Sequence, residues 1–506
     1  MNLLLAAISG VLGALAFPKA HLWPLAFLFL APLFIAVKRS ASPKETVLSS
    51  FVFGLFYFGA LFNGITELYF YVSFWAYVAW MGLVLFQSLF IAAFCLLAEK
   101  MIKREEGRLR DLFIVPSVWV IIEWIRALGP FGVTGGGVGY SLATVLPLIQ
   151  ISSITGVYGV SFVALLSNLV LFRALAYRRD LAGRSWRMRG ELAILAIVFL
   201  AALSFGYHRL SLMVEGPSSF RVAVIQPNID QPTKLNFAMK ERILDAHVAL
   251  TREILEGKPD LVIWPETAVT TYLFYDKPVL SRLSRLISEA GAYFLVGAPE
   301  WEEGKAYNSA FLFSPAGSLC GRYDKQKLVP FGEYIPLRPL LYPVFHLTSD
   351  FFSTMDYGYD ARREAVLLNA GPRKLGVAVC FESTFPSIIS DRVREGADDI
   401  VVITNDAWFA DSSLAYQHLD SGVFRAVETG VPLIQAGNTG FSAIIAPSGR
   451  IIRETRLNRK TALLCEVPEK TGATIYVRCG DAFILLLAVY LGLILAMKRL
   501  AGHRAV

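Results

Sequence analysis

The chain has few of the residues that usually bind metal ions or form redox centres. Its 506 residues include only five cysteines and six histidines. The cysteines (Cys95, Cys320, Cys380, Cys465 and Cys479) form no CxxC pair, and no two histidines stand at ligand spacing. We therefore expect no metal and no cofactor. A disulfide between Cys465 and Cys479 stays open, because spacing alone does not decide pairing.

Charged residues are also scarce, at 18% of the chain, while 55% of the residues are hydrophobic and the mean hydropathy is +0.51. This composition excludes an ordinary soluble protein of this size. Residues 208–480 carry 29 Lys and Arg against 31 Asp and Glu, whereas the rest of the chain carries 19 against 10. The basic excess therefore belongs to the apolar flanks, so it indicates a membrane protein rather than a nucleic-acid-binding one.

Eight apolar runs approach the roughly 17–25 residues that a helix needs to span a bilayer. They lie at about 2–17, 22–37, 47–71, 74–98, 112–128, 155–175, 191–207 and 481–498. The first two are the shortest. This pattern predicts seven transmembrane helices over 1–207 and a final one with a short tail over 481–506. Inside the fifth run, Glu123 and Arg126 stand three positions apart, which favours a local ion pair.

The distribution of Lys and Arg predicts the orientation in the membrane, because cytoplasmic loops are enriched in both residues. Basic residues gather in the second, fourth and sixth loops and in the C-terminal tail, while the alternate loops hold little more than Lys19 and Arg126. We therefore expect both termini in the cytoplasm and residues 208–480 on the opposite side of the membrane.

Residues 208–480 alternate between strand and helix patterns, which predicts an α/β domain of sheets covered by helices. Strands are expected at 221–227, 261–264, 293–297, 309–313, 375–380, 400–404, 433–436, 442–446 and 462–467. Helices are expected at 240–256, 278–290, 386–395 and 415–428.

The sequence GVAVCFES, at 376–383, reads as a buried strand that presents Cys380 at the sheet edge before a turn and a helix. The N-terminus of a helix lowers the pKa of a nearby thiol and can stabilise an oxyanion. The alternative is that Cys380 is a small buried hydrophobic residue, as most lone cysteines are.

Two further stretches have the same character. In DLVIWPET a buried strand ends at Glu266, where a carboxylate would suit a general base, although a helix-capping or surface glutamate is the alternative. In YDKQKLVPFGE, Lys325 could stabilise an oxyanion near an acyl carbonyl, although a solvated basic loop is the alternative.

The motifs WPET, YDKQKLVPFGEYIP and VAVCFES together resemble the three catalytic boxes of the carbon–nitrogen hydrolase (nitrilase) superfamily. The apolar runs, with GYS at 139–141, GVYGVSF at 156–162 and TNDAWF at 404–409, make the chain similar to one membrane-embedded family within it, the bacterial apolipoprotein N-acyltransferases. Two positions depart from the usual boxes: Lys327 replaces a histidine, and Phe381 replaces a tyrosine that is frequent there.

The resemblance implies a nitrilase-like α-β-β-α sandwich on a bundle of eight transmembrane helices, in the inner membrane with the 208–480 domain in the periplasm. It implies a catalytic triad of Glu266, Lys325 and Cys380. Further residues would support the triad (Glu333, Phe381, Glu382) or contact substrate as part of a lid (Trp408 and, from an apolar insertion at 337–373, Leu340, Phe345, Phe351 and Phe352).

In that family a phospholipid donates an acyl chain to the enzyme cysteine, and the α-amine of a diacylglyceryl-cysteine apolipoprotein accepts it. No nucleic acid is expected as a partner. Two alternatives stay open at this point. One is a membrane-tethered amidase that uses water as the acceptor, and the other is a non-enzymatic receptor or scaffold with an inactive hydrolase domain.

Overall fold

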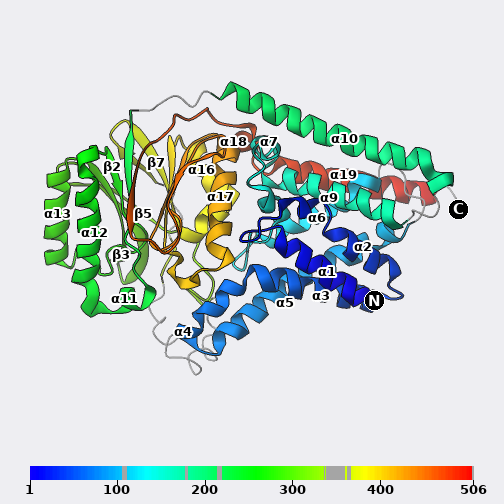
Figure 1. Ribbon diagram of the computed structural model, residues 1–506, viewed down its shortest axis with the longest axis horizontal. Coiled ribbons are helices and arrows are strands. Elements are labelled where there is room, and N and C mark those ends of the chain that lie inside the picture. Colours follow the sequence, from blue (N-terminus) through cyan, green and yellow to red (C-terminus); the bar gives the residue numbers. More distant parts are fainter. Residues whose placement is uncertain are drawn as a thin grey trace. The chain divides into compact units, whose positions relative to one another are not determined.

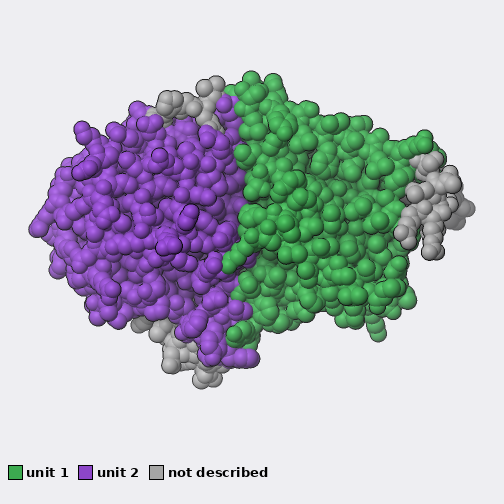
Figure 2. All heavy atoms as spheres, viewed as in Figure 1, with its two compact units in different colours: residues 1–63, 77–212, 479–506 green, residues 64–76, 213–478 purple. Residues whose placement is uncertain are grey.

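A computed structural model of the chain describes residues 1–104, 111–176, 181–213, 219–335, 337, 359–361 and 366–503. The chain forms two compact units (Figure 2). Unit 1 comprises Met1–Asn63, Tyr77–Leu212 and Cys479–Val506, and unit 2 comprises Gly64–Ala76 and Met213–Arg478. A short stretch between two apolar helices therefore belongs with the α/β unit.

Unit 2 contains two six-stranded mixed sheets. The first has the order β12-β1-β2-β3-β4-β5, with β1, β2 and β3 parallel and the other pairs antiparallel. Its strands are β1 (Arg221–Gln226), β2 (Leu261–Ile263), β3 (Tyr293–Glu302), β4 (Lys305–Phe313), β5 (Leu319–Asp324) and β12 (Thr461–Glu466).

The second sheet has the order β11-β10-β9-β8-β7-β6, with β7, β8 and β9 parallel. Its strands are β6 (Leu367–Ala370), β7 (Arg373–Val379), β8 (Asp399–Thr404), β9 (Leu433–Gly437), β10 (Ala443–Ile445) and β11 (Ile451–Glu454). In each sheet the parallel strands thus lie inside and the antiparallel strands lie outside.

The two sheets pack face to face. Since alternate residues of each strand point to opposite sides, each strand contributes one set of side chains to the core between the sheets. Val222 and Val224 of β1 join Val377 and Val379 of β7 in the core between the sheets. The intervening residues of β1 point to the other face of the first sheet, which helices cover. Central strands buried on both faces read as continuous apolar runs, and this is why the sequence predicted them.

Helices cover both outer faces, as Figure 1 shows. On the first sheet lie α12 (Lys240–Ile254) and α13 (Lys277–Ala290), whose leucines and isoleucines pack on β1, β2 and β3. On the second lie α16 (Pro386–Arg394) and α17 (Ser413–Thr429). The α-β-β-α sandwich and all nine predicted strands are confirmed.

Three strands were missed, β5, β6 and β11, and each lies at an edge of its sheet. An edge strand is covered on fewer sides, so its sequence needs fewer apolar residues. The exposed outward residues of β11 and the partly exposed residues of β5 show this. The helical turn α11 (Gln231–Leu235) was missed as well.

Unit 1 is helical. Its helices are α1 (Asn2–Leu15), η1 (Trp23–Phe27), α2 (Leu30–Arg39), α3 (Pro43–Leu61), α5 (Trp75–Lys103), α6 (Asp111–Arg126), η3 (Val138–Leu142), α7 (Leu146–Ile149), α8 (Ser152–Thr155), α9 (Val157–Ala176), α10 (Leu181–Leu212) and α19 (Ala482–His503).

Fewer helices than predicted are long and apolar enough to cross a membrane. Among the described residues three qualify, Trp75–Lys103, Val157–Ala176 and Trp186–Leu212, and the bent pair Pro43–Leu61 and Asn63–Val72 would make a fourth. The structure therefore supports three or four spans by length and composition, and it does not show eight.

The second predicted span, 22–37, is broken into η1 and α2. The side chain of Asn168 on α9 satisfies the backbone at the break: its Oδ1 accepts from Leu30 N (2.7 Å) and its Nδ2 donates to Ala26 O (2.7 Å). Backbone groups away from water need such partners, so a single buried amide makes the interruption tolerable. A local hydropathy pattern contains no sign of a partner so distant in sequence.

Glu123 and Arg126 form no direct ion pair among the described residues, although their charges interact. Glu123 instead accepts hydrogen bonds from Trp119 Nε1 (2.8 Å), Ser161 Oγ (2.8 Å) and Val138 N (3.4 Å). Arg126 lies over the ring of Phe58. Through Ser161 and Val138 this carboxylate ties α6 to α9 and to η3.

Candidate active site

Cys380 follows β7 directly and begins the short helix η8 (Cys380–Thr384). Its φ of 53° lies in the left-handed region, where residues other than glycine are uncommon and often functional. The preceding strand is central and parallel to β8, so the thiol lies at the carboxyl edge of the parallel strands. This is where α/β sheets bind ligands.

The pKa of the Cys380 thiol is raised well above its ordinary value, which corrects the expectation that the helix N-terminus would lower it. Burial is the main cause, and the charges of Glu266 and Asp406 add to it. Lys325 and a hydrogen bond from Thr404 act in the opposite direction and are outweighed. The resting sulfur is therefore a thiol, and a base must remove its proton during any attack.

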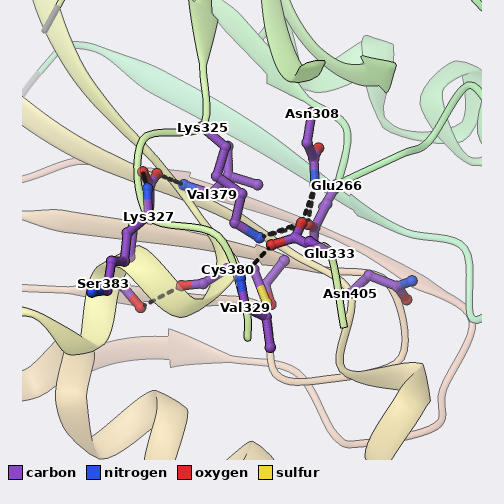
Figure 3. A network of polar contacts seen from close by, with 12 residues as sticks. Glu266, Asn308, Lys325, Lys327, Val329, Glu333, Val379, Cys380, Ser383 and Asn405 are labelled. Atoms are coloured by element: carbon purple, nitrogen blue, oxygen red, sulfur yellow. Dashed lines mark hydrogen bonds and ion pairs between the residues drawn. The ribbon is translucent and has the colours of Figure 1, made fainter. Parts of the chain in front are cut away.

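Figure 3 shows the side chains of Glu266, Lys325 and Cys380 converging from the ends of three strands, β2, β5 and β7. Lys325 Nζ lies 2.9 Å from Glu333 Oε1 and 3.4 Å from Glu266 Oε1. Asn308 of β4 bridges the same two carboxylates, because its Nδ2 donates to Glu266 Oε1 (2.7 Å) and Glu333 Oε1 (3.0 Å). Two carboxylates thus share one ammonium and one amide.

Lys325 is 1% exposed, yet its pKa is raised well above the ordinary lysine value. Burial alone lowers it, but the charges of Glu333 and Glu266 outweigh burial. The side chain is therefore a fixed ammonium group. A buried cation beside a thiol is suited to stabilise negative charge that develops on a reacting carbonyl oxygen.

Glu382 joins the segment that carries Lys325 to the strand that carries Cys380. Its Oε1 accepts from Gln326 N (2.6 Å) and Lys327 N (3.0 Å), and its Oε2 accepts from Val379 N (2.7 Å). The hydroxyl of Tyr323 lies 2.9 Å from both oxygens. A fully buried carboxylate with this many donors fixes the distance between the two segments.

Comparison with known proteins identifies the family. Residues 221–476 match the carbon-nitrogen hydrolase family, and residues 9–170 match the N-terminal domain of apolipoprotein N-acyltransferases. An apolipoprotein N-acyltransferase of Geobacter metallireducens is 38% identical over 493 residues, which cover 95% of this chain and 92% of that protein. The chain belongs to the apolipoprotein N-acyltransferase family.

A second member of this family, from Thermotoga maritima, is 30% identical over 515 residues, which cover 100% of this chain and 95% of that protein. Among solved structures, an amidase from Nesterenkonia sp. matches with 19% identity and a TM-score of 0.40, over 54% of this chain and 97% of the amidase. The two related acyltransferases, not the amidase, confirm the predicted family resemblance over nearly the whole chain.

Lys327 and Phe381, the two residues that depart from the expected catalytic motifs, both contact one neighbouring aromatic ring. Lys327 donates its backbone N–H to Glu382, and its ammonium lies 5.0 Å from the centre of the Phe385 ring. Phe381 packs edge to face on the same ring at 4.9 Å. Both side chains therefore contact Phe385, and neither takes part in the Glu266–Lys325 network.

Trp408, predicted to contact substrate, lies on η9 (Asp406–Phe409) and packs edge to face on Tyr71 at 5.2 Å. Tyr71 belongs to α4 (Tyr69–Val72), within the short stretch that joins unit 2. The other predicted lid residues, Leu340, Phe345, Phe351 and Phe352, lie outside the described residues.

Sequence reasoning missed several polar residues of the site. Asn308 stood in an apolar strand with no motif around it. Lys234 of α11 donates to the backbone oxygen of Glu266 (2.9 Å), and burial lowers its pKa to about 7 although the charge of Glu266 opposes this. His418 of α17 contacts the backbone oxygen of Cys380 (3.1 Å). Among the described residues no cluster of His, Cys, Asp and Glu is arranged to hold a metal ion.

Proposed function

We propose that this chain transfers a fatty acyl group from a phospholipid to the α-amine of the N-terminal S-diacylglyceryl-cysteine of an apolipoprotein. Cys380 carries the acyl group as a thioester between the two half-reactions. The observation that carries the proposal is the convergence of Glu266, Lys325 and Cys380 in a chain whose other unit consists of apolar helices. Both proposed substrates lie in the membrane, so an enzyme that acts on them needs a membrane anchor of this kind.

In the first half-reaction Glu266 acts as the general base. It takes the proton of the Cys380 thiol while the sulfur forms a bond to the ester carbon of the phospholipid. The raised pKa of the thiol makes this transfer necessary. The tetrahedral intermediate then collapses: its bond to the glycerol oxygen breaks, and protonated Glu266 returns the proton to the leaving lysophospholipid.

The negative charge of the tetrahedral intermediate would be held by Lys325 and by the backbone N–H of Phe381. Lys325 is already charged and buried, so it needs no rearrangement at the moment of reaction. Glu333, which accepts from Lys325 and from Val329 N (2.8 Å), would keep the ammonium aimed at the developing oxyanion. Glu382 would hold the segment that carries Lys325 at a fixed distance from the end of β7, which leads to Cys380.

In the second half-reaction the α-amine of the apolipoprotein attacks the thioester carbon. Glu266 accepts a proton from the attacking nitrogen, the carbon–sulfur bond breaks, and the proton returns to the Cys380 sulfur. The product is an amide, and the free thiol is ready for the next donor. Trp408 and the predicted lid residues Leu340, Phe345, Phe351 and Phe352 would contact the acyl chains.

The proposal includes the topology expected from the sequence. Residues 1–207 would form seven spans, residues 208–480 a periplasmic catalytic domain, and residues 481–506 the eighth span and a cytoplasmic tail. The charge distribution supports this orientation. The shorter apolar helices Asn2–Leu15 and Ala482–Lys498 would add spans where the bilayer thins to match their length.

The test is intact mass spectrometry of the purified chain after incubation with a bacterial phospholipid extract in detergent micelles. We expect a mass increase of one fatty acyl group, lost on addition of neutral hydroxylamine and absent from Cys380→Ala. Addition of a synthetic diacylglyceryl-cysteine peptide should discharge the thioester and yield the N-acylated peptide. Discharge by water at the same rate without the peptide would favour the amidase alternative, and no thioester on Cys380 would contradict the proposal.

A further inference from the structure

A buried cluster beneath the nucleophile has no role in the reaction described above. It consists of His418 from α17, Asp406 from η9, Thr404 from the end of β8 and Ser383 from η8. All four side chains are at least nine-tenths buried. Burial of this many polar groups is costly unless they act together, so their hydrogen bonds indicate what the cluster does.

The imidazole of His418 contacts two groups that can only accept hydrogen bonds, and two hydroxyls, those of Ser383 (2.7 Å from Nε2) and Thr404 (3.5 Å from Nδ1), lie beside them. Its Nδ1 is 3.1 Å from the Asp406 carboxylate, and its Nε2 is 3.1 Å from the backbone oxygen of Cys380. Both contacts are hydrogen bonds only when the ring carries a proton on each nitrogen. Burial lowers the pKa of His418, but the charge and hydrogen bond of Asp406 outweigh it, so the pKa is raised.

Ser383 reinforces the same contact. Its hydroxyl donates to the Cys380 oxygen at 3.0 Å, and its oxygen lies 2.7 Å from Nε2 of His418 (Figure 3 shows the Ser383 contact). The carbonyl of the nucleophile thus accepts from two buried donors. Asp406 is held in turn by the Thr404 hydroxyl at 3.2 Å. The arrangement orients one peptide group, the one between residues 380 and 381.

The carbonyl oxygen and the N–H of a trans peptide group point in opposite directions within one plane. Anchoring the Cys380 oxygen therefore sets the direction of the Phe381 N–H, which is the backbone donor assigned to the oxyanion. A charged donor on the oxygen also polarises the peptide and strengthens its N–H as a donor. The left-handed φ of Cys380 makes this anchoring necessary, because such a backbone persists only where its surroundings hold it.

We infer that His418, held by Asp406 and assisted by Ser383, is a positioning residue that aims the Phe381 N–H at the oxyanion. This inference rests on the proposed function, since it assumes a tetrahedral intermediate on Cys380. His418 contacts neither substrate nor the reacting atoms in this assignment. Ser383 is not a second nucleophile, because its side chain is fully buried and its proton is donated to the Cys380 oxygen.

Two amide substitutions at His418 distinguish its proposed role in orienting the Phe381 N–H from a role in packing. Glutamine places an N–H₂ near the position of Nε2 and can still donate to the Cys380 oxygen, whereas asparagine places its amide near Nδ1 and reaches only Asp406. The thioester should form about 100-fold more slowly in His418→Asn, the loss typical of misaligned reacting groups, and within about tenfold of the natural rate in His418→Gln. Ser421→Ala removes a buried hydroxyl on α17 that donates to Gln417 O (2.8 Å), and it serves as the control for changes within that helix.

The second readout is alkylation of Cys380 by iodoacetamide at the pH of the acylation assay, since every variant retains Glu266 to take the thiol proton. Alkylation displaces iodide without forming an oxyanion, so a misaimed Phe381 N–H should leave its rate near the natural one in every variant. Acylation is measured by mass spectrometry with the phospholipid micelles, and thermal unfolding reports whether each variant is folded. A selective loss of acylation, restored by glutamine, is the expected result.

Three outcomes would overturn the inference: unchanged acylation in folded His418→Asn, equal losses in the two amide variants, or a parallel loss of alkylation. If His418→Asn does not fold, Ser383→Ala carries the test, and unchanged acylation there would be decisive against it. Absence of the thioester in the natural protein, with alkylation intact, would count against the proposed function rather than against the positioning role.

Discussion

Glu123 in unit 1 and Glu266 in unit 2 are buried to nearly the same extent, 7% and 6% exposed, but their partners differ. Glu123 accepts hydrogen bonds from an indole, a hydroxyl and a backbone N–H, and the charge of Arg126 acts on it without a direct ion pair. Glu266 shares an ammonium and an amide with a second carboxylate, close to a thiol. The first arrangement holds segments together, and the second is the one to which we assign proton transfer. Burial alone therefore does not distinguish a structural carboxylate from one proposed to react.

The largest effect in this comparison should come from the thiol beside Glu266. Cys380→Ala should abolish thioester formation and transfer, and Cys380→Ser should do the same because a serine hydroxyl is a far weaker nucleophile than a thiol. Transfer of acyl groups to a diacylglyceryl-cysteine peptide is the measurement. Undiminished transfer by either folded variant would remove Cys380 from the mechanism.

The next effect concerns the partners of the thiol. Glu266→Gln removes the base, and Lys325→Ala removes an oxyanion donor, a loss typically worth about 10²–10³ in rate. We expect both variants to be folded and to form thioester slowly, as followed by mass spectrometry over time. Normal accumulation of the acyl-enzyme in both would show that these residues have other roles.

The structural carboxylate should respond in the opposite way. Glu123→Gln replaces one accepting oxygen by an NH₂ group, so one of the buried donors around it loses its acceptor. A buried donor without an acceptor costs about 1–3 kcal/mol. The detergent-solubilised variant should unfold at a lower temperature. In the folded variant, Cys380 should react with iodoacetamide and with phospholipid at the rates of the natural protein. A fall in acylation at unchanged thermal stability would give Glu123 a part in the reaction and erase the contrast with Glu266.

The smallest effect is a pH dependence of stability from His418, a cation beside a carboxylate. Its pKa is raised in the folded protein, so its contribution to stability is complete below the unfolded value of about 6.5 and is lost as the pH rises through the folded value. The groups that face it are Asp406, the Cys380 carbonyl and, at longer range, Glu266. The difference in melting temperature between the natural protein and His418→Gln should shrink from pH 6 toward alkaline pH. A constant difference would indicate a neutral imidazole.

The central strands of the sheets could be predicted from local sequence patterns, whereas three edge strands could not. The strands that carry Glu266 and Cys380 are central and buried on both faces, so apolar runs of β-branched residues marked them. The edge strands β5, β6 and β11 lack such runs and were missed, although β5 leads directly to Lys325. Lys325 was found through its motif rather than through its strand.

The sequence alone determined the two-part organisation by hydropathy and charge, the α/β class, and the three motif residues Glu266, Lys325 and Cys380. Each of these depends on residues that are neighbours in the chain. The tertiary structure decided the raised pKa of the Cys380 thiol, the sharing of Asn308 between two carboxylates, the broken second helix at Asn168 and the contact of His418 with the nucleophile's carbonyl. These features depend on groups tens to more than a hundred residues apart, whose distances no local pattern contains.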